Sequence, residues 1–166
     1  VHHDGERLLI AGAFGSVREY NEDRDLIATY PERTTVVSVD VVNGGILAGT
    51  TGGSTTLWNP AHETTVYVAP EGVELYDLVN GGDVIVVGTS AGAQVMAPGA
   101  EGWRALSVEE PPGEANYTYY YEISADGQVL VNQTSNGDLL TLDRRGEAFE
   151  IADVMPGQST IVGLKL

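Results

Sequence analysis

The chain repeats one pattern of glycine turns and short apolar runs four times along its 166 residues. Each copy has a first glycine turn and a second one eight to ten residues later. The first turns are at Gly5, Gly45, Gly82 and Gly127, and the second turns are at Gly15, Gly53, Gly92 and Gly137. A period of about 40 residues indicates one small structural unit that is repeated and packed against its neighbours. Six residues after the second turn we expect another, at Asn21, Asn59, Pro98 and Asp143.

Four strand-like segments recur in each copy, in the same order. The clearest is a continuous apolar run, as expected of a strand that is covered on both faces. This run spans 8–10, 46–48, 84–87 and 129–131. The next two segments span 16–20, 54–58, 93–97 and 138–142, then 25–30, 64–69, 103–108 and 148–153. The last segment opens the following copy, at 35–42, 73–79, 117–124 and 159–166. No window combines a helical apolar period with caps, so the chain is predicted to be all-β.

The fourth copy shows the pattern best, because Gly127 to Glu147 reads GQVLVNQTSNGDLLTLDRRGE. This order of glycines, apolar runs and a closing aspartate resembles the repeats of β-propeller proteins, especially the PQQ-like type. The resemblance covers nearly the whole chain and implies a β-propeller fold. The chain lacks the tryptophan that ends each repeat in enzymatic PQQ-like propellers, and it lacks the Trp-Asp and Gly-His marks of WD repeats. We therefore expect no cofactor.

We expect a single domain of four four-stranded blades, over residues 1–34, 35–72, 73–116 and 117–158. The chain begins without the first strand of a blade and ends on a lone one, 159–166. That last strand is predicted to pair beside Arg7–Gly12, which completes the first blade and removes an open sheet edge. Two alternatives stay open: a piece of a longer propeller, or half of an eight-bladed ring made by two chains.

The formal charge is −16, with seven arginines and one lysine. Phosphate binding requires a basic footprint, so no nucleic-acid partner is expected. An anionic membrane surface would repel the chain, and no apolar run reaches the roughly 18–20 residues that span a bilayer. Many acids with almost no lysine are typical of proteins adapted to molar salt, where the Debye length is about 3 Å. The alternative is an acidic surface that keeps the protein soluble.

Gly88-Thr89-Ser90-Ala91-Gly92 matches the G-x-S-x-G nucleophile elbow, which requires a helix after the serine. Residues 93–96 are expected to form a strand instead, and the position of Ser90 holds alanine, threonine or serine in the other copies. A tight turn that needs small residues explains all four, so no catalytic residue is predicted. The three histidines and the acidic turn at 22–25 lack the spacing of zinc or calcium ligands, so no metal is expected.

One connection departs from the repeat. It contains Glu110 and leads into Tyr117, Tyr119 and Tyr120. Tyrosine is favoured at interfaces, and loops often carry function. We therefore predict these four residues as binding residues, with packing between blades as the alternative.

Three further residues are candidate sites. Trp58 is a possible stacking platform for a sugar, although it aligns with Tyr20 and Leu142, which favours core packing. Asn116 and Asn132 each begin an N-x-S/T sequon and are candidate glycosylation sites.

The sequence favours a non-enzymatic interaction or structural module, part of a larger surface or virion assembly from a halophilic source. Its partners are then proteins or assembly neighbours, including further copies of the chain. Two alternatives stay open: a lectin-like propeller that uses Trp58 or Trp103, and a propeller hydrolase or lyase with its site at the central funnel. The sequons favour an exterior location, and the lack of cysteine leaves the redox compartment undecided.

Overall fold

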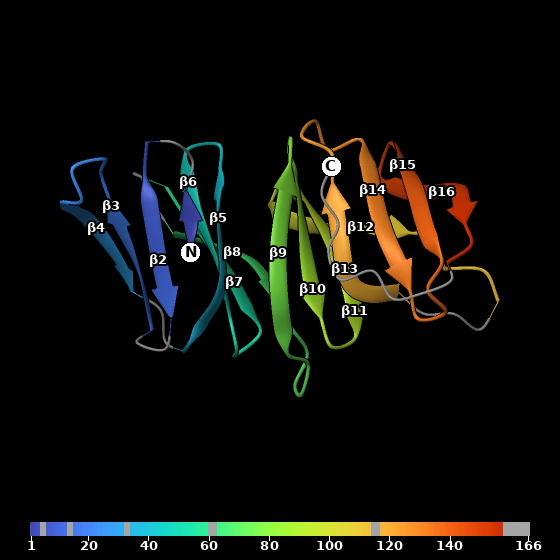
Figure 1. Ribbon diagram of the computed structural model, residues 1–166, viewed down its shortest axis with the longest axis horizontal. Helices are drawn as coiled ribbons and strands as arrows, with labels where there is room; N and C mark the ends of the chain where they lie inside the picture. The colour runs from blue at the N-terminus through green and yellow to red at the C-terminus, as the bar shows by residue number, and fades with distance from the viewer. Residues whose placement is uncertain (4–5, 13–14, 32–33, 60–62, 114–116, 158–166) are drawn as a thin grey trace. The chain divides into compact units, whose positions relative to one another are not determined.

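The computed structural model describes residues 1–157 except 4–5, 13–14, 32–33, 60–62 and 114–116. The side chains of residues 117–120 also lie outside the described part. Every helix or strand that the structure assigns within these limits is a β-strand, as the sequence predicts (Figure 1). Consecutive strands pair antiparallel in four groups of four.

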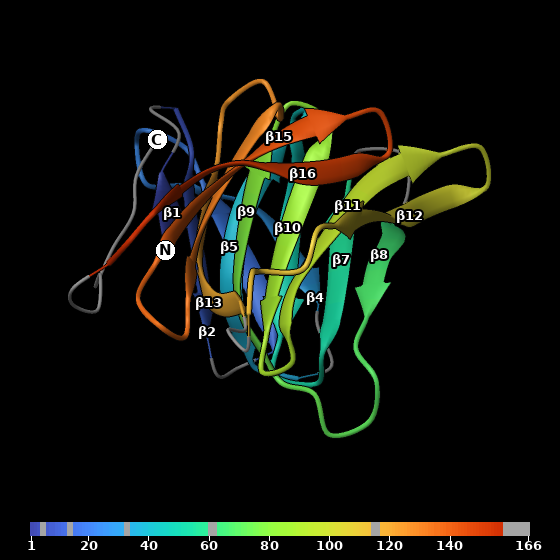
Figure 2. The ribbon, with the colours of Figure 1, turned by 90° about the vertical axis from the view of Figure 1, so that its right-hand side faces the viewer.

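The strands of each group follow the order of the chain. The first group is β1 (His2–His3), β2 (Leu8–Gly12), β3 (Ser16–Tyr20) and β4 (Leu26–Pro31). The second is β5 (Val36–Val42), β6 (Gly45–Thr50), β7 (Ser54–Trp58) and β8 (Glu63–Val68). The third is β9 (Leu75–Gly81), β10 (Val84–Thr89), β11 (Gly92–Gly99) and β12 (Gly102–Val108). The fourth is β13 (Tyr117–Ile123), β14 (Val129–Thr134), β15 (Leu139–Arg145) and β16 (Ala148–Met155). Figure 2 shows β11 beside β12 and β15 beside β16.

In the second, third and fourth groups, burial falls from the second strand to the fourth. Every residue of β6 and β10 is buried, which accounts for their continuous apolar sequences. In the fourth strands most residues are exposed or only partly buried. Leu26 and Ile27 of β4 are both more than half exposed. The apolar runs in the sequence therefore mark the most buried strand of the second, third and fourth copies, whereas in the first copy β2 is less buried than β3.

The chain divides into two compact units, and the first spans Val1–Leu78. Within this unit, β2 and β3 pack against β5. The core between the first and second groups consists of Leu9, Val17, Val36, Val39, Ile46, Ala48 and Trp58. Burial of a Leu or Ile side chain contributes about 1.5–3 kcal/mol, so these contacts hold the two groups together.

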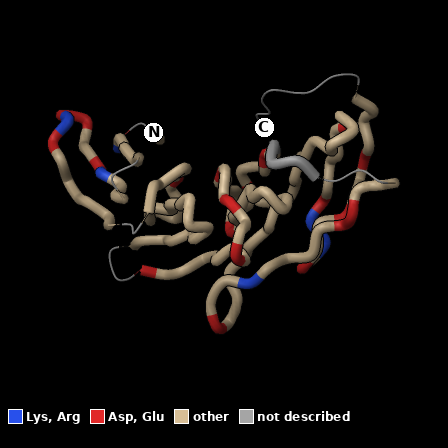
Figure 3. The backbone as a smooth tube through the Cα atoms, turned by 90° about the horizontal axis from the view of Figure 1, so that it is seen from below, with Lys and Arg blue, Asp and Glu red and all other residues tan. Residues whose placement is uncertain are grey.

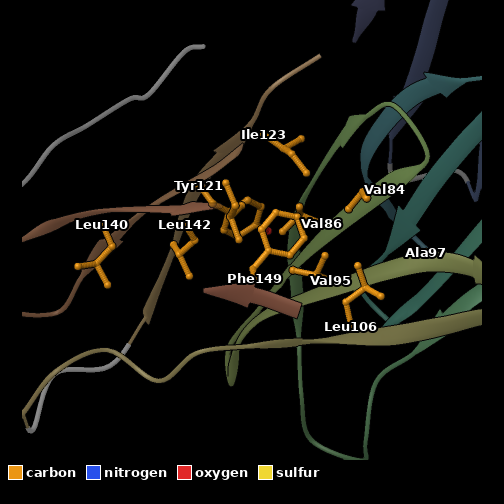
Figure 4. Close-up of a cluster of buried hydrophobic side chains, with 11 residues drawn as sticks. Val84, Val86, Val95, Ala97, Leu106, Tyr121, Ile123, Leu140, Leu142 and Phe149 are labelled. Atoms are coloured by element: carbon orange, nitrogen blue, oxygen red, sulfur yellow. The ribbon is translucent and has the colours of Figure 1, made fainter. Parts of the chain in front are cut away.

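The second unit spans Val79–Leu166. Its core joins the third and fourth groups and includes Val84, Val86, Val95, Leu106, Tyr121, Leu130, Leu142 and Phe149. Figure 4 shows the rings of Phe149 and Tyr121 between aliphatic side chains of β10 and β15. The apolar face of each group is thus buried against its neighbour in sequence.

A short parallel pairing joins the two groups of the second unit into one eight-stranded sheet. The Ser107 amide donates to the Glu147 carbonyl at 3.1 Å, and the Glu109 amide donates to the Phe149 carbonyl at 2.9 Å. Among the described residues of the first unit, β4 and β8 belong to separate sheets. In β12, Ser107 comes directly after the core residue Leu106. In β4, Pro31 comes directly after Tyr30, which packs against the core of the first unit. Proline has no amide hydrogen, so Pro31 is unable to donate the bond that Ser107 donates.

Two predicted turns are wrong. Asn21 does form a turn, with its amide donating to the Asp25 carbonyl at 3.1 Å. Pro98 and Asp143, however, lie within β11 and β15. The turns come later in the sequence, at Gly102 and Gly146, which both have positive φ. The two strands are therefore longer than the sequence pattern indicates.

The edge of β2 that was expected to receive residues 159–166 carries β1 instead. His2 lies opposite Leu9 and His3 opposite Leu8, in an antiparallel pair. Residues 159–166 lie outside the described part of the chain. Pairing with a segment that is close in sequence costs less loop entropy than recruiting the far end of the chain, which favours β1 at this edge.

Candidate functional site

A cavity of about 250 Å³ lies within the first unit, between its two groups of strands. Its lining consists of Arg7, Glu19 and Tyr30 from the first group, and Gly44, Ile46, Trp58 and Asn59 from the second. The wall therefore combines apolar and aromatic surface with a few polar groups, which is the usual composition of a ligand site.

Glu19 lies opposite Leu9 in the ladder of β2 and β3. The corresponding residues are Leu57, opposite Leu47, in the second group and Thr141, opposite Val131, in the fourth. The next residue, Tyr20, lies opposite Leu8 and corresponds to Trp58 and Leu142, which lie opposite Ile46 and Leu130. The register therefore agrees with the alignment of Tyr20, Trp58 and Leu142 in the sequence.

The sequence analysis missed Arg7, Glu19, Tyr30 and Asn59 as site residues. An acidic residue in the middle of the strand predicted at 16–20 was the available signal. Recognising it required knowing which face of β3 is buried, which the glycine spacing alone does not provide.

Two side chains contact the Glu19 carboxylate, which is only 8% exposed. The Tyr30 hydroxyl donates to Glu19 Oε2 at 2.6 Å. Arg7 Nη1 donates to Glu19 Oε1 at 3.4 Å and to the Gly44 carbonyl, also at 3.4 Å. A buried carboxylate is unfavourable unless it is paired and hydrogen-bonded, and these contacts meet that need.

The phenol of Tyr30 responds to the same environment. Burial raises the pKa of Tyr30 to about 12, and the hydrogen bond to Glu19 and the negative charge of Glu19 act in the same direction, while Arg7 opposes them. Tyr30 therefore stays protonated and remains a hydrogen-bond donor at neutral pH. The phenol ring also lies near the indole of Trp58, with centroids 5.5 Å apart and planes tilted by 37°.

The site offers acceptors and negative charge. Glu19 supplies two carboxylate oxygens, Gly44 supplies a backbone carbonyl, and Trp58 supplies an aromatic wall. A carboxylate accepts hydrogen bonds at about four lone-pair positions. This arrangement suits a small cationic donor.

The architecture of the chain is similar to that of a solved WD40 propeller, the Cps50 (Swd1) β-propeller domain of Myceliophteria thermophila. The TM-score is 0.71 at 15% sequence identity, over 96% of this chain. The chain has a β-propeller fold. It spans 55% of the length of that propeller domain. No protein-family model and no curated protein matches the sequence.

Two predicted binding residues line cavities of this propeller chain. Trp58 lines the cavity of the first unit but is only 6% exposed, so its ring packs in the core rather than forming an open platform. Glu110 is exposed and lines a second cavity, of about 230 Å³, within the second unit. The rest of that lining comes mainly from small and apolar residues of β11 and β12. The two residues therefore belong to different sites.

Tyr117, Tyr119 and Tyr120 belong to β13, and their side chains lie outside the described part of the chain. Asn116 also lies outside the described residues. Asn132 lies in β14 and is 1% exposed. The side chain of Asn132 is therefore buried in the folded chain, and its glycosylation stays a prediction.

The serine motif lies in a strand–turn–strand segment. β10 ends at Thr89 and β11 begins at Gly92, and the Thr89 hydroxyl donates to the Gly92 carbonyl at 2.7 Å. A nucleophile elbow requires a following helix, so Ser90 does not have that geometry. Within the described ranges, no cluster of three or more metal-ligating side chains and no helix able to cross a membrane is found.

Proposed function

We propose that the chain is a non-enzymatic interaction module built as a four-bladed β-propeller. The likeness to a WD40 propeller over nearly the whole chain carries this proposal. Each antiparallel group of four strands serves as one blade, and the stacked sheets hold the connecting loops rigidly. Function then resides in what the loops and cavities contact rather than in a reacting group.

The proposed setting is a surface or virion assembly in a salt-rich environment, with protein neighbours or further copies of the chain as partners. Figure 3 shows acidic residues along both units and few basic ones, in agreement with the charge of −16. A high negative charge favours solubility and disfavours contact with other acidic molecules. The proposed contact residues are Glu110, Tyr117, Tyr119 and Tyr120.

Native mass spectrometry of the chain purified with its neighbours from its source tests this proposal. We expect a defined complex of fixed stoichiometry that the Tyr119→Ser/Tyr120→Ser double variant dissociates. Tyr76→Ser is the matched control, because Tyr76 is exposed on β9 outside this segment. A chain that is isolated alone and monomeric, with all variants folded by circular dichroism, would contradict an interaction function.

A further inference from the structure

We propose that the cavity of the first unit is a receptor for a guanidinium group, such as an arginine side chain presented by a partner. This inference rests on the proposed interaction function, because it names the chemical group by which a partner is recognised. The cavity residues that carry it are Arg7, Glu19, Gly44 and Trp58.

The acceptors of the cavity match what a guanidinium needs. A guanidinium has five N–H donors in a plane and no acceptor, and it pairs well with carboxylates. Glu19 and the Gly44 carbonyl supply the acceptors, and both are already within reach of one nitrogen, Nη1 of Arg7. Two acceptors from different groups of strands therefore converge on a single donor position.

The aromatic wall adds a second attraction. A guanidinium is attracted to the face of a tryptophan ring, and it also stacks on that ring because both are planar. Trp58 lines the cavity together with Glu19, so a bound cation would meet charge on one side and an aromatic ring on another. The low exposure of Glu19 and Trp58 strengthens both attractions, because little water screens them.

Arg7 already occupies part of this receptor. Its hydrogen bonds to Glu19 Oε1 and to the Gly44 carbonyl are each 3.4 Å long, beyond the usual 2.7–3.2 Å range for N–H···O bonds. Its side chain is 25% exposed, so it has a route to solvent. An incoming guanidinium takes over Glu19 Oε1 and the Gly44 carbonyl as Arg7 moves outward.

Space and charge also fit. The cavity volume of about 250 Å³ is below the roughly 300–1,000 Å³ of sites that hold drug-sized ligands. This suits one side-chain head group and not a large ligand. The net charge of −16 attracts a cation to the chain before it docks.

The test uses the full chain carrying Trp103→Phe, so that Trp58 is its sole tryptophan. The probes are two capped tripeptides, acetyl-Gly-Arg-Gly-amide and the same peptide with citrulline, which has nearly the shape of arginine without its charge. Titrations at constant ionic strength follow Trp58 fluorescence. We expect saturable binding of the arginine peptide and at least about tenfold weaker binding of the citrulline peptide, as for loss of one charged hydrogen bond.

Three variants separate a receptor from general charge attraction. Glu19→Gln is expected to weaken binding of the arginine peptide at least about tenfold. Arg7→Met is expected to strengthen it several-fold, since the internal competitor is removed. Asp23→Asn changes the charge by the same amount as Glu19→Gln, at an exposed position of the first unit, and is expected to leave the affinity unchanged.

Equal affinity for the two peptides would overturn the proposal, as would the absence of saturable binding to both wild type and a folded Arg7→Met variant. If Glu19→Gln fails to fold by circular dichroism, the peptide comparison on wild type and Arg7→Met still decides. A negative result here would leave the interaction function intact, because native mass spectrometry of the assembly tests that function without the peptides.

Discussion

The two units build the seam between their strand groups in different ways. In the first unit the seam contains the charged and polar trio Arg7, Glu19 and Tyr30 beside a cavity. In the second unit the seam is filled by aliphatic residues with Tyr121 and Phe149. Its nearby ion pair joins Arg144 to Asp83 through two hydrogen bonds, of 2.5 and 3.2 Å, and Asp83 is half exposed.

This difference shows that one repeat admits two kinds of interface. A seam filled with apolar side chains gains stability from burial. A seam with a buried carboxylate pays a desolvation penalty that its partners offset, and here it retains open space. The seam of the first unit is therefore where recognition of a charged group is expected, and the seam of the second unit is where packing contributes most to stability.

The largest expected effect is on the apolar seam. Phe149→Ala removes a fully buried ring from the second unit and is expected to lower the free energy of unfolding by about 3–5 kcal/mol. Val154→Ala, on the same strand but 39% exposed, is the control and is expected to change it by less than about 1 kcal/mol. Guanidinium chloride unfolding followed by circular dichroism measures both. Similar losses for the two variants would mean that the seam is not packed as described.

The polar seam should show strong coupling between its charges. Arg7→Met leaves the buried Glu19 carboxylate without its cation and is expected to cost about 1–3 kcal/mol. Adding Glu19→Leu, which gives this position the residue that Leu57 provides in the second group, should restore stability to within about 1 kcal/mol of wild type. The same unfolding measurement on both single variants and the double variant completes the cycle. Additive losses would show that the two charges do not interact.

Substitutions of two glycines compare the space beside the backbone in the two units. A Cβ at Gly88 of the second unit would overlap the Tyr121 hydroxyl, whereas a Cβ at Gly12 of the first unit meets no atom within 4 Å. We expect Gly88→Ala to cost about 1–3 kcal/mol, as overpacked cores do. Gly12→Ala should leave the unfolding free energy nearly unchanged. Thermal unfolding of the two variants tests the comparison, and a larger loss at Gly12 would contradict it.

The smallest effect concerns alkaline pH and involves only the polar seam. The folded-state pKa of Tyr30 is raised to about 12, above its ordinary value of 10.0, so folding favours the neutral phenol. This contribution to stability is complete below about pH 10 and is lost as the pH rises toward 12. Tyr30→Phe should remove that part of the pH dependence in urea unfolding. Ultraviolet titration at pH 9–12 should also show one fewer late-ionising tyrosine, and identical curves for the variant and wild type would refute the assignment.

Much of the fold was predictable because its signals are local. The apolar run at 84–87 becomes the fully buried β10, and the prolines at 31, 70, 111 and 156 lie at or just beyond strand ends. The candidate site was less predictable. Trp58 was singled out as a stacking platform, and Glu19 was missed because the glycine spacing does not show which face of β3 is buried.

Residue periodicity, glycine spacing and proline positions were enough to define an all-β repeat, since turns and strand burial depend on neighbours in sequence. Tertiary packing alone decided that β12 pairs with β16 and that Glu19 meets Arg7, Tyr30 and Trp58. These contacts join residues that are distant in the chain. Their partners are set by register and side-chain volume across a seam, which no local pattern encodes.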